Sequence, residues 1–324
     1  RSTCGRCQRY LSALTMAACS PGNVPHVSVI VCTYRAPASL QRTLWSLVQQ
    51  ALNPTDYEII VVDNRSSTET ADLVTQTAAH TVTHIAYCAE PQIGLSHARN
   101  RGIDMARAPI VAFIDDDAEA DSHWLASLLA VYRSYPDAGA VGGRVRGLWE
   151  LSRPVWLTDE LLRSLSLIDR GDELRALAWP ERIIGANMSF RRSTFEKLGN
   201  FNTHLGRSGA SLTGNEDTEI QQRIHRYGGM VYYTPQALVW HRVPAQRLTR
   251  RHFYQRAFGH GQSQARLRNL GLSDYPRRGL WWHVALLAKS VLLPPLHTGS
   301  FFESTLSPVY AAGFIREYLW RSDR

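Results

Sequence analysis

Residues 110–117 read IVAFIDDD and give the strongest single indication of the fold. Five apolar residues, rich in β-branched and aromatic types, lie between Pro109 and three consecutive aspartates. A short run of this kind is typical of a strand that is buried on both faces of a parallel sheet. Adjacent carboxylates repel one another unless a cation offsets them, and their oxygens suit Mg²⁺ and Mn²⁺. We therefore expect a metal or nucleotide site where this strand ends, the alternative being a solvated acidic turn or a helix N-cap.

The same order of strand, polar exit and helix recurs earlier in the chain. VSVIVC (27–32) precedes TYR (33–35), EIIVV (58–62) precedes Asp63, and helical spacing follows each exit. This alternation predicts βαβ units and an α/β fold with a mainly parallel sheet. Open sheets of this class bind nucleotides in the crevice beyond the carboxyl ends of their strands. The polar exits, with those at 115–117, are therefore predicted to line one nucleotide site.

The chain resembles the family 2 glycosyltransferases, which have the GT-A fold. The matching segments occur in the family's order and cover roughly residues 27–242: VSVIVCTYRAPASLQRTLWSL, EIIVVDNRSS, IGLSHARNRGI, IVAFIDDDAEADSHWLASLL, GANMSFRRSTFEKLGNFN and GNEDTEIQQRIHRYGG. The resemblance implies a GT-A-type mixed, mainly parallel sheet flanked by helices. It also implies an inverting enzyme that moves a sugar from a nucleotide-diphosphate donor to a hydroxyl acceptor, as in polysaccharide or glycoconjugate synthesis.

The resemblance assigns the first strand exits to the donor. Thr33, Tyr34 and Arg35 are expected to line the nucleoside pocket, with the tyrosine ring beside the base and the guanidinium on phosphate. Asp63 is expected to accept a hydrogen bond from the base, which favours a UDP- or dTDP-sugar, and its alternative is a helix N-cap. Arg99 is expected to hold Asp63 or the diphosphate, or else to be an exposed helical arginine.

Asp115 and Asp117 match the Asp-x-Asp motif of the family, and Asp117 is the expected direct ligand of Mg²⁺ or Mn²⁺. Asp116 belongs to the same nucleotide site but should face the other way, because side chains alternate along a strand. His241 is expected to complete the metal shell or to touch the diphosphate, the alternative being a structural histidine. A divalent ion here would neutralise the charge that builds on the departing diphosphate.

The segment GNED (214–217) precedes a helical pattern that ends at two glycines. An inverting transfer needs one carboxylate base within reach of the acceptor hydroxyl. Asp217 is the expected base and Glu216 its rival, the alternative being favourable charge at a helix N-terminus. Three tryptophans upstream are expected either to stack on the acceptor or to pack in the core: Trp149, Trp156 and Trp179.

The segment from 246 onward has a different character. RLTRRHFYQRAFGHGQSQARLR (247–268) alternates arginines with aromatic residues, and RGLWWHVALLAKSVLLPPL (278–296) holds no apolar window long enough to span a bilayer. The pattern predicts peripheral contact with an acidic membrane surface, or a helical subdomain packed against the catalytic sheet and able to form a dimer. Nucleic-acid binding is not expected, because no recognition module accompanies the arginines.

A chain of 324 residues, 44% hydrophobic, is long enough for one large α/β core plus an appendage, and its net charge of +8 suits an anionic donor or surface. The expected division is an N-terminal arm at 1–24, a GT-A catalytic domain at 25–245 and a basic amphipathic helical region at 246–324. Within the catalytic domain, residues 25–120 are expected to bind the nucleotide and residues 121–245 to hold the base and the acceptor.

The cysteines point to a reducing compartment. Cys4 and Cys7 have the spacing of half a zinc site, but no second pair follows nearby. Cys32 and Cys88 lie in predicted strands and should be reduced core residues. The expected location is therefore the cytoplasm, either free or at the inner face of the cell membrane.

Two other functions are open on the sequence. A sugar nucleotidyltransferase also places a metal on aspartates at a sheet edge, but TYRAPAS (33–39) lacks the glycines of its phosphate loop. A catalytically silent sugar- or membrane-binding protein on the same scaffold would not require a base, so the ED pair at 216–217 argues against it.

Overall fold

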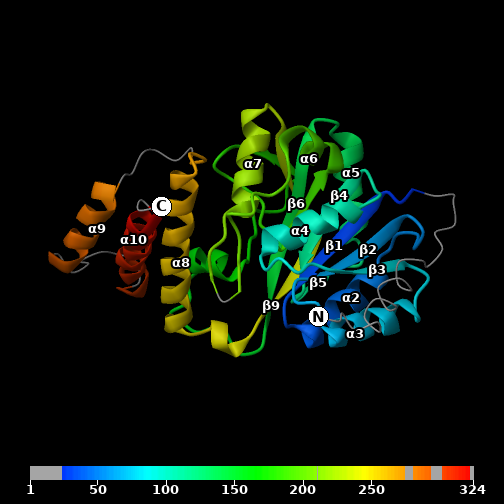
Figure 1. Ribbon diagram of the computed structural model, residues 1–324, viewed down its shortest axis with the longest axis horizontal. Helices are drawn as coiled ribbons and strands as arrows, with labels where there is room; N and C mark the ends of the chain where they lie inside the picture. The colour runs from blue at the N-terminus through cyan, green and yellow to red at the C-terminus, as the bar shows by residue number, and fades with distance from the viewer. Residues whose placement is uncertain (1–23, 210, 274–279, 293–300, 322–324) are drawn as a thin grey trace, which may run out of the picture.

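The computed structural model describes residues 24–209, 211–273, 280–292 and 301–321. The predicted arm, with Cys4 and Cys7, therefore lies outside the described residues apart from Val24. A nine-stranded sheet forms the centre, in the order β3-β2-β1-β4-β8-β6-β9-β5 with β7 beside β9. Figure 1 shows helices on both faces of the sheet and three further helices, α8, α9 and α10, standing to one side of it.

The N-terminal half is the parallel sheet that the sequence predicts, with strand order 3-2-1-4. Its elements are β1 Val27–Thr33, α2 Pro37–Val48, β2 Tyr57–Asp63, α3 Thr68–Ala78, β3 His84–Ala89, α4 Leu95–Met105 and β4 Ile110–Asp115. β1, β2 and β4 are buried along nearly their whole length because they are apolar on both faces. The register sets Thr33 opposite Asp63 and Cys32 opposite Asp115, so the polar exits meet at one edge.

The second half makes the sheet mixed. Its elements are β5 Ala118–Ala120, α5 Trp124–Ser134, β6 Ala138–Trp149, η2 Asp159–Leu165, β7 Arg175–Leu177, β8 Asn187–Arg191, α6 Arg192–Leu198, α7 Glu216–Arg226 and β9 Met230–Val243. β8 runs antiparallel to both β4 and β6, whereas β9 runs parallel to β6. β5 pairs antiparallel with β9 and sets Ala118 opposite His241, which draws this histidine to the aspartates.

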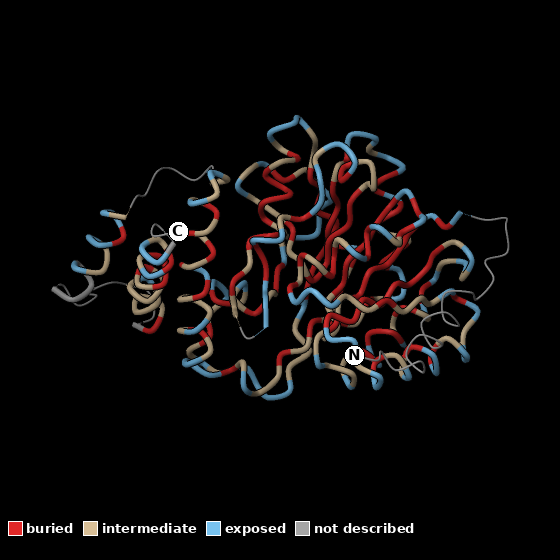
Figure 2. Tube along the Cα trace, viewed as in Figure 1, coloured by how far each residue is buried: buried red, intermediate tan, exposed pale blue. Residues whose placement is uncertain are grey.

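Two apolar layers cover the sheet. On one face, side chains of α2, α3 and α5 pack against β1, β2 and β4, with Trp124 fully buried. On the other face, α4, α6 and α7 pack against the alternate residues of the same strands, where Phe113 meets Phe190, Phe195 and Phe201 edge-on. Figure 2 shows the buried positions concentrated along the strands. This rigid sheet fixes the edge where the polar side chains gather.

The C-terminal helices lie beside the central sheet, as the predicted helical appendage. They are η3 Ala245–Arg247, α8 Arg250–Asn269, α9 Leu280–Leu292 and α10 Phe301–Arg321. Trp156 packs edge-on against Phe253 of α8 and Phe302 of α10, which ties both helices to the sheet. None of the described helices is long and apolar enough to cross a membrane.

Candidate active site

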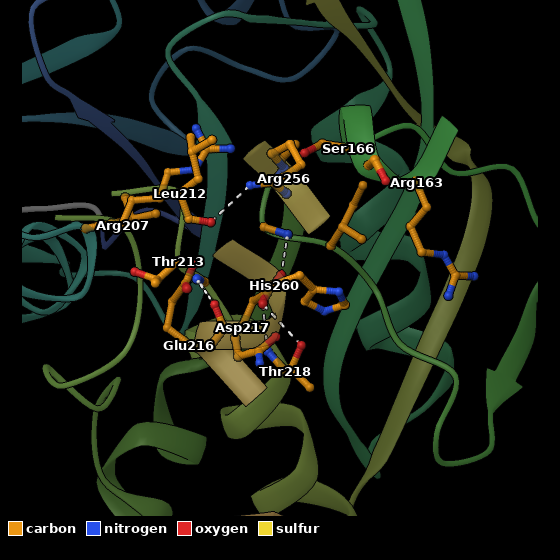
Figure 3. A pocket seen from close by; sticks show the side chains of 18 of the residues that line it. Arg163, Ser166, Arg207, Leu212, Thr213, Glu216, Asp217, Thr218, Arg256 and His260 are labelled. Atoms are coloured by element: carbon orange, nitrogen blue, oxygen red, sulfur yellow. Dashed lines mark hydrogen bonds between the residues drawn. The ribbon is translucent and has the colours of Figure 1, made fainter. Parts of the chain in front are cut away.

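A cavity of about 1080 Å³ lies at the carboxyl ends of β1 and β4 and extends between α7 and the C-terminal helices. Its volume slightly exceeds the roughly 300–1,000 Å³ typical of a site for one small ligand, so two substrates have room there. Of the donor, metal and base residues predicted from the sequence, all except Arg35 and Asp63 line it. Figure 3 shows part of the lining, with α7 and α8 supplying facing side chains.

Asp115, Asp117 and His241 form a cluster whose ligand atoms all lie within 4.8 Å of one another. The Nε2 of His241 is 3.2 Å from Asp117 Oδ1 and 3.8 Å from Asp115 Oδ2. The Nδ1 of this buried ring has no hydrogen-bond partner within the described residues. Two carboxylates and an imidazole that converge on one point are a donor set that fits a divalent metal ion.

Positive charge already balances this acidic cluster. The Nη2 of Arg247 lies 2.8 Å from Asp117 Oδ2. Burial alone would raise the pKa of Asp117, but the His241 ring and the Arg247 guanidinium outweigh burial and hold that pKa below its usual range. Asp117 is therefore ionised at neutral pH and available to a cation.

Asp116 stands apart from the cluster. Its Oδ2 accepts a hydrogen bond of 2.6 Å from the Thr33 hydroxyl, and its carbonyl oxygen accepts one of 3.0 Å from the Thr43 hydroxyl. Burial and the neighbouring charge of Asp117 raise the pKa of Asp116 to about 7. Thr33 and Thr43 therefore anchor the acidic segment to β1 and α2.

Tyr34 and Arg35 separate at the rim. Tyr34 lines the cavity, whereas Arg35 is exposed, with its guanidinium 5.2 Å from the centroid of the Tyr34 ring. Arg35 also has a left-handed backbone, with φ of 61°. Its predicted contact with phosphate remains a prediction.

Asp63 is 1% exposed and holds its own loop. Its carboxylate accepts hydrogen bonds from the backbone N–H groups of Arg65 at 2.9 Å and Ser67 at 2.7 Å, and from the Tyr87 hydroxyl at 3.2 Å. The N-cap of α3 is Ser67, whose side chain accepts from Thr70 N–H, so the N-cap alternative for Asp63 is wrong. Its role as a reader of the base rests on the family resemblance.

Arg99 is 3% exposed, so the alternative of an exposed helical arginine is wrong. Its partners are two carboxylates other than Asp63. The Arg99 Nη1 donates to Glu216 Oε1 at 2.7 Å, and its Nη2 lies 4.0 Å from Asp115 Oδ1. Glu216 is itself 5% exposed, and burial raises its pKa against the effect of the Arg99 charge. The pair thus joins α4 to the start of α7 beside the acidic segment.

Asp217 faces the cavity from the first turn of α7 and is only half-buried. Its Oδ2 accepts from Gly185 N–H at 3.0 Å and its Oδ1 from Thr218 N–H at 2.8 Å. A Cβ on Gly185 would meet Arg99 Nη2 at 2.7 Å, so a larger residue here would displace the Arg99 guanidinium. A carboxylate has about four acceptor positions, so Asp217 is held in place and still able to accept a further proton.

Two arginines and a histidine that also line the cavity were not predicted from the sequence: Arg207, Arg256 and His260. Arg256 and His260 are four residues apart on α8 and therefore share one face, which is the signal that was present in the sequence. The enclosure of the His260 ring in the cavity, with the charges of Arg182 and Arg256, lowers its pKa.

The tryptophans predicted as acceptor contacts do not line the cavity. Trp156 packs between α8 and α10 as described above, and the Trp179 ring lies 5.9 Å from that of His225. Packing is therefore the role of Trp156.

Comparison with known proteins agrees with this geometry. The family model described as Glycosyl transferase family 2 matches residues 28–199, more than half of the chain. A glucosyl-dolichyl phosphate glucuronosyltransferase of Haloferax volcanii is 31% identical over 67% of this chain and 69% of its own. The succinoglycan biosynthesis protein ExoM of Rhizobium meliloti is 31% identical over 76% of each chain.

Among solved structures, the mannosyltransferase PcManGT of Pyrobaculum calidifontis, in complex with GDP-Man and Mn²⁺, superposes with a TM-score of 0.63. The match covers 98% of this chain and 93% of the other at 21% identity. At that identity the likeness is one of fold.

Proposed function

Because this chain belongs to glycosyl transferase family 2 and is a glycosyltransferase, we propose that it moves a sugar from a nucleotide-diphosphate donor to an acceptor hydroxyl with inversion. The observation that carries the proposal is the shared cavity: the Asp115, Asp117 and His241 cluster and the Asp217 carboxylate line the same space. The metal-binding cluster suits a diphosphate, and the Asp217 carboxylate suits an acceptor hydroxyl.

The proposed reaction is a single displacement. Asp217 takes the proton of the acceptor hydroxyl while the oxygen of that hydroxyl bonds to the anomeric carbon of the donor sugar. The bond from that carbon to the diphosphate oxygen breaks, and the electron pair leaves with the nucleoside diphosphate. Glu216 is the weaker candidate for the base, because Arg99 already binds its carboxylate.

Asp117, Asp115 and His241 are the residues that would hold Mg²⁺ or Mn²⁺. An ion held by them would supply charge neutralisation for the departing diphosphate. The solved mannosyltransferase has Mn²⁺ with its sugar nucleotide, which supports the same class of ion here.

The proposed donor is a UDP- or dTDP-sugar, on the strength of Asp63 in the family motif. Since the solved mannosyltransferase holds GDP-Man, a guanosine donor is the competing choice. The proposed acceptor is a carbohydrate, a lipid-linked sugar or another hydroxyl compound. The names of the Haloferax and Rhizobium relatives, which refer to a dolichyl phosphate and to succinoglycan, support glycoconjugate or polysaccharide synthesis.

Peripheral membrane contact through residues 246–324 is part of the proposal, as is the division of the chain at residue 245. Residues 246–324 carry 12 basic and 4 acidic side chains, whereas residues 1–245 carry 24 of each. The whole net charge of +8 thus lies in the C-terminal region, where it would attract anionic headgroups at the inner face of the membrane.

The test is thermal unfolding with UDP, dTDP, GDP and ADP, each with and without Mn²⁺ or Mg²⁺. A nucleotide present at about 100 times its Kd adds roughly 2.7 kcal/mol to the free energy of unfolding, which is a visible shift in Tm. We expect one nucleotide to stabilise the protein only with metal, and Asp117→Asn to abolish the shift. Asp104→Asn, an exposed aspartate on α4, is the matched control and should leave the shift intact.

Stabilisation without metal, or an unchanged shift in Asp117→Asn, would contradict the proposed site. Metal-dependent binding without transfer to any acceptor in a sugar-release assay would favour the silent scaffold. Formation of a sugar nucleotide from a sugar phosphate would favour the nucleotidyltransferase.

A further inference from the structure

The cavity has a second end that the donor and the base do not use. Beyond Asp217 its lining passes to α9 and α10, where it is apolar and aromatic: Trp282, Leu286, Leu306, Tyr310 and Phe314. His283 reinforces this wall by stacking on Phe314, with ring centroids 3.6 Å apart. Sugars and nucleotides are polar, so a wall of this composition suits an apolar chain instead.

Arg256 of α8 lines the same cavity as the base. Figure 3 shows it beside Leu212, with Glu216 and Asp217 in the same lining, and these two carboxylates are the negative charges that act on it. Its Nη1 donates to the Leu212 carbonyl oxygen at 3.4 Å. In the described part of the chain, no carboxylate is within ion-pair distance of its guanidinium, so a charge beside the cavity is left for a ligand.

Arg256 lines the cavity together with Arg207 and Arg247, and the charges of both act on it. Of these three arginines, only Arg247 forms an ion pair with Asp117 within the described residues, whereas the negative charges that act on Arg256 are Glu216 and Asp217 of α7. Arg247 therefore belongs to the diphosphate end of the cavity. Arg256 belongs to the end where the acceptor must present its hydroxyl to Asp217.

We propose that the acceptor is an anionic amphiphile, whose apolar chain lies against α9 and α10, whose phosphate pairs with Arg256 and whose hydroxyl reaches Asp217. This inference rests on the proposed function and names the substrate class of its acceptor end. Guanidinium groups pair well with phosphate, and the apolar wall removes the chain from water. One cavity then holds a polar donor and an amphiphilic acceptor end to end.

The wall is fixed to the catalytic core by close helix contacts. A Cβ on Gly261 of α8 would overlap the backbone oxygen of Tyr310, and one on Gly313 of α10 would overlap that of Phe258. The Ser263 hydroxyl of α8 also accepts a 2.8 Å hydrogen bond from Gly214 N–H, directly before α7. The apolar end is therefore held at a set distance from Asp217.

The probe for this inference is dodecyl phosphate, used below its micelle concentration with the full chain in isothermal calorimetry. Butyl phosphate has the same head with a short chain, and dodecyl maltoside has the same chain without the charge. We expect dodecyl phosphate to bind at least about tenfold more tightly than either. Inorganic phosphate alone should bind no better than butyl phosphate.

Two pairs of variants locate the binding. Leu286→Asp places a charge in the apolar wall, and Val284→Asp makes the same change two residues away at an exposed position outside the lining. Arg256→Gln removes the proposed phosphate partner, and Arg251→Gln is its exposed control on the same helix. We expect a loss of about tenfold or more in dodecyl phosphate affinity in Leu286→Asp and Arg256→Gln, and less than about twofold in the controls.

Nucleotide binding with Mn²⁺, measured on the same variants, separates this inference from the proposed function. If the nucleotide binds but dodecyl phosphate does not, the acceptor class is wrong and the glycosyltransferase site stands. If Arg256→Gln weakens the nucleotide and spares dodecyl phosphate, Arg256 belongs to the donor and the inference is overturned. Equal losses in Val284→Asp and Leu286→Asp would likewise place the amphiphile outside the cavity.

Discussion

Two adjacent carboxylates at the start of α7 differ in what surrounds them, and this difference decides their roles. Glu216 is 5% exposed, with Oε1 bound to Arg99 and Oε2 lacking any partner in the described part of the chain. Asp217 is half-buried, lines the cavity and accepts hydrogen bonds from the Gly185 and Thr218 N–H groups and the Thr218 hydroxyl, with no guanidinium bound to it in the described part of the chain. Glu216 thus secures a buried guanidinium, and Asp217 is the group that an acceptor can reach.

We expect the two positions to separate stability from turnover. Asp217→Asn should lower the transfer rate by about 10²–10⁴-fold, the range for loss of a general base, with nucleotide binding and Tm nearly unchanged. Glu216→Ala should lower the free energy of unfolding by about 3–5 kcal/mol, because it leaves Arg99 buried without its closest carboxylate. Chemical denaturation and initial rates at saturating donor measure both, and a large rate loss in Glu216→Gln with an active Asp217→Asn would reverse the assignment.

A site residue could be predicted from the sequence where the neighbouring residues reveal its place, and not where its role depends on a contact with a distant part of the chain. Asp115 to Asp117 and the pair at 216–217 were found because they follow a strand and precede a helix, and local pattern reveals such places. The pairing of Arg99 with Glu216 joins residues 117 positions apart, and no local pattern encodes it. Asp63 shows the converse problem: a strand-exit carboxylate fits a base reader, yet its contacts in the structure are with its own loop and Tyr87.

The contact between α8 and α10 is the element on which the acceptor end of the cavity depends. Gly261 and Gly313 let the two helix backbones approach so closely that a Cβ at either position would overlap the other helix. Arg266 Nε also donates to Glu317 Oε1 at 2.7 Å across the same contact, and Glu317 is 1% exposed. Tyr310 and Phe314 of the apolar wall stand on either side of Gly313.

Gly313→Ala tests this contact, because helix propensity and packing predict opposite signs. Propensity alone would stabilise α10 by roughly 1 kcal/mol, whereas forced overlap with Phe258 costs about 1–3 kcal/mol in well-packed cores. We expect overlap to win, with a lower Tm and weaker dodecyl phosphate binding but unchanged nucleotide binding. Gln255→Ala, at an exposed position of α8 outside the lining, should change the free energy of unfolding by less than about 0.5 kcal/mol. A raised Tm in Gly313→Ala would show that the helices are not packed this closely.

The helices and strands with the clearest hydrophobic pattern were the ones that the sequence predicted best. The parallel strands β1, β2 and β4 are apolar runs with polar exits, and each was expected near its observed place. The antiparallel insertion of β8 between β4 and β6 was not predicted, since strand direction depends on long-range pairing that composition does not reveal. That insertion makes half of the sheet mixed, and the pairing of β5 with β9 then brings His241 to the aspartates.

On the scale of the whole molecule, charge and exposed aromatic residues lie at one end. The helices farthest from the sheet in Figure 1 expose Trp281 at 79% and Trp320 at 62%, within the region that holds the entire net charge. Trp282 is both 38% exposed and part of the apolar wall, so the outer surface and the acceptor end share a residue. An amphiphile taken from a membrane would therefore have a short apolar path to the cavity.

We expect the full chain to bind vesicles that contain anionic phospholipid and to release them at high salt, because exposed basic groups are screened there. Trp281→Ala combined with Trp320→Ala should weaken binding by about tenfold, since partial transfer of two rings from water is worth at least about 1.4 kcal/mol. Trp45→Ala is the control: Trp45 is 43% exposed but lies on α2, away from these helices (Figure 1). Co-sedimentation at a fixed lipid concentration measures all three, and an equal loss in the Trp45 variant would mean that contact with the membrane is not made through the C-terminal helices.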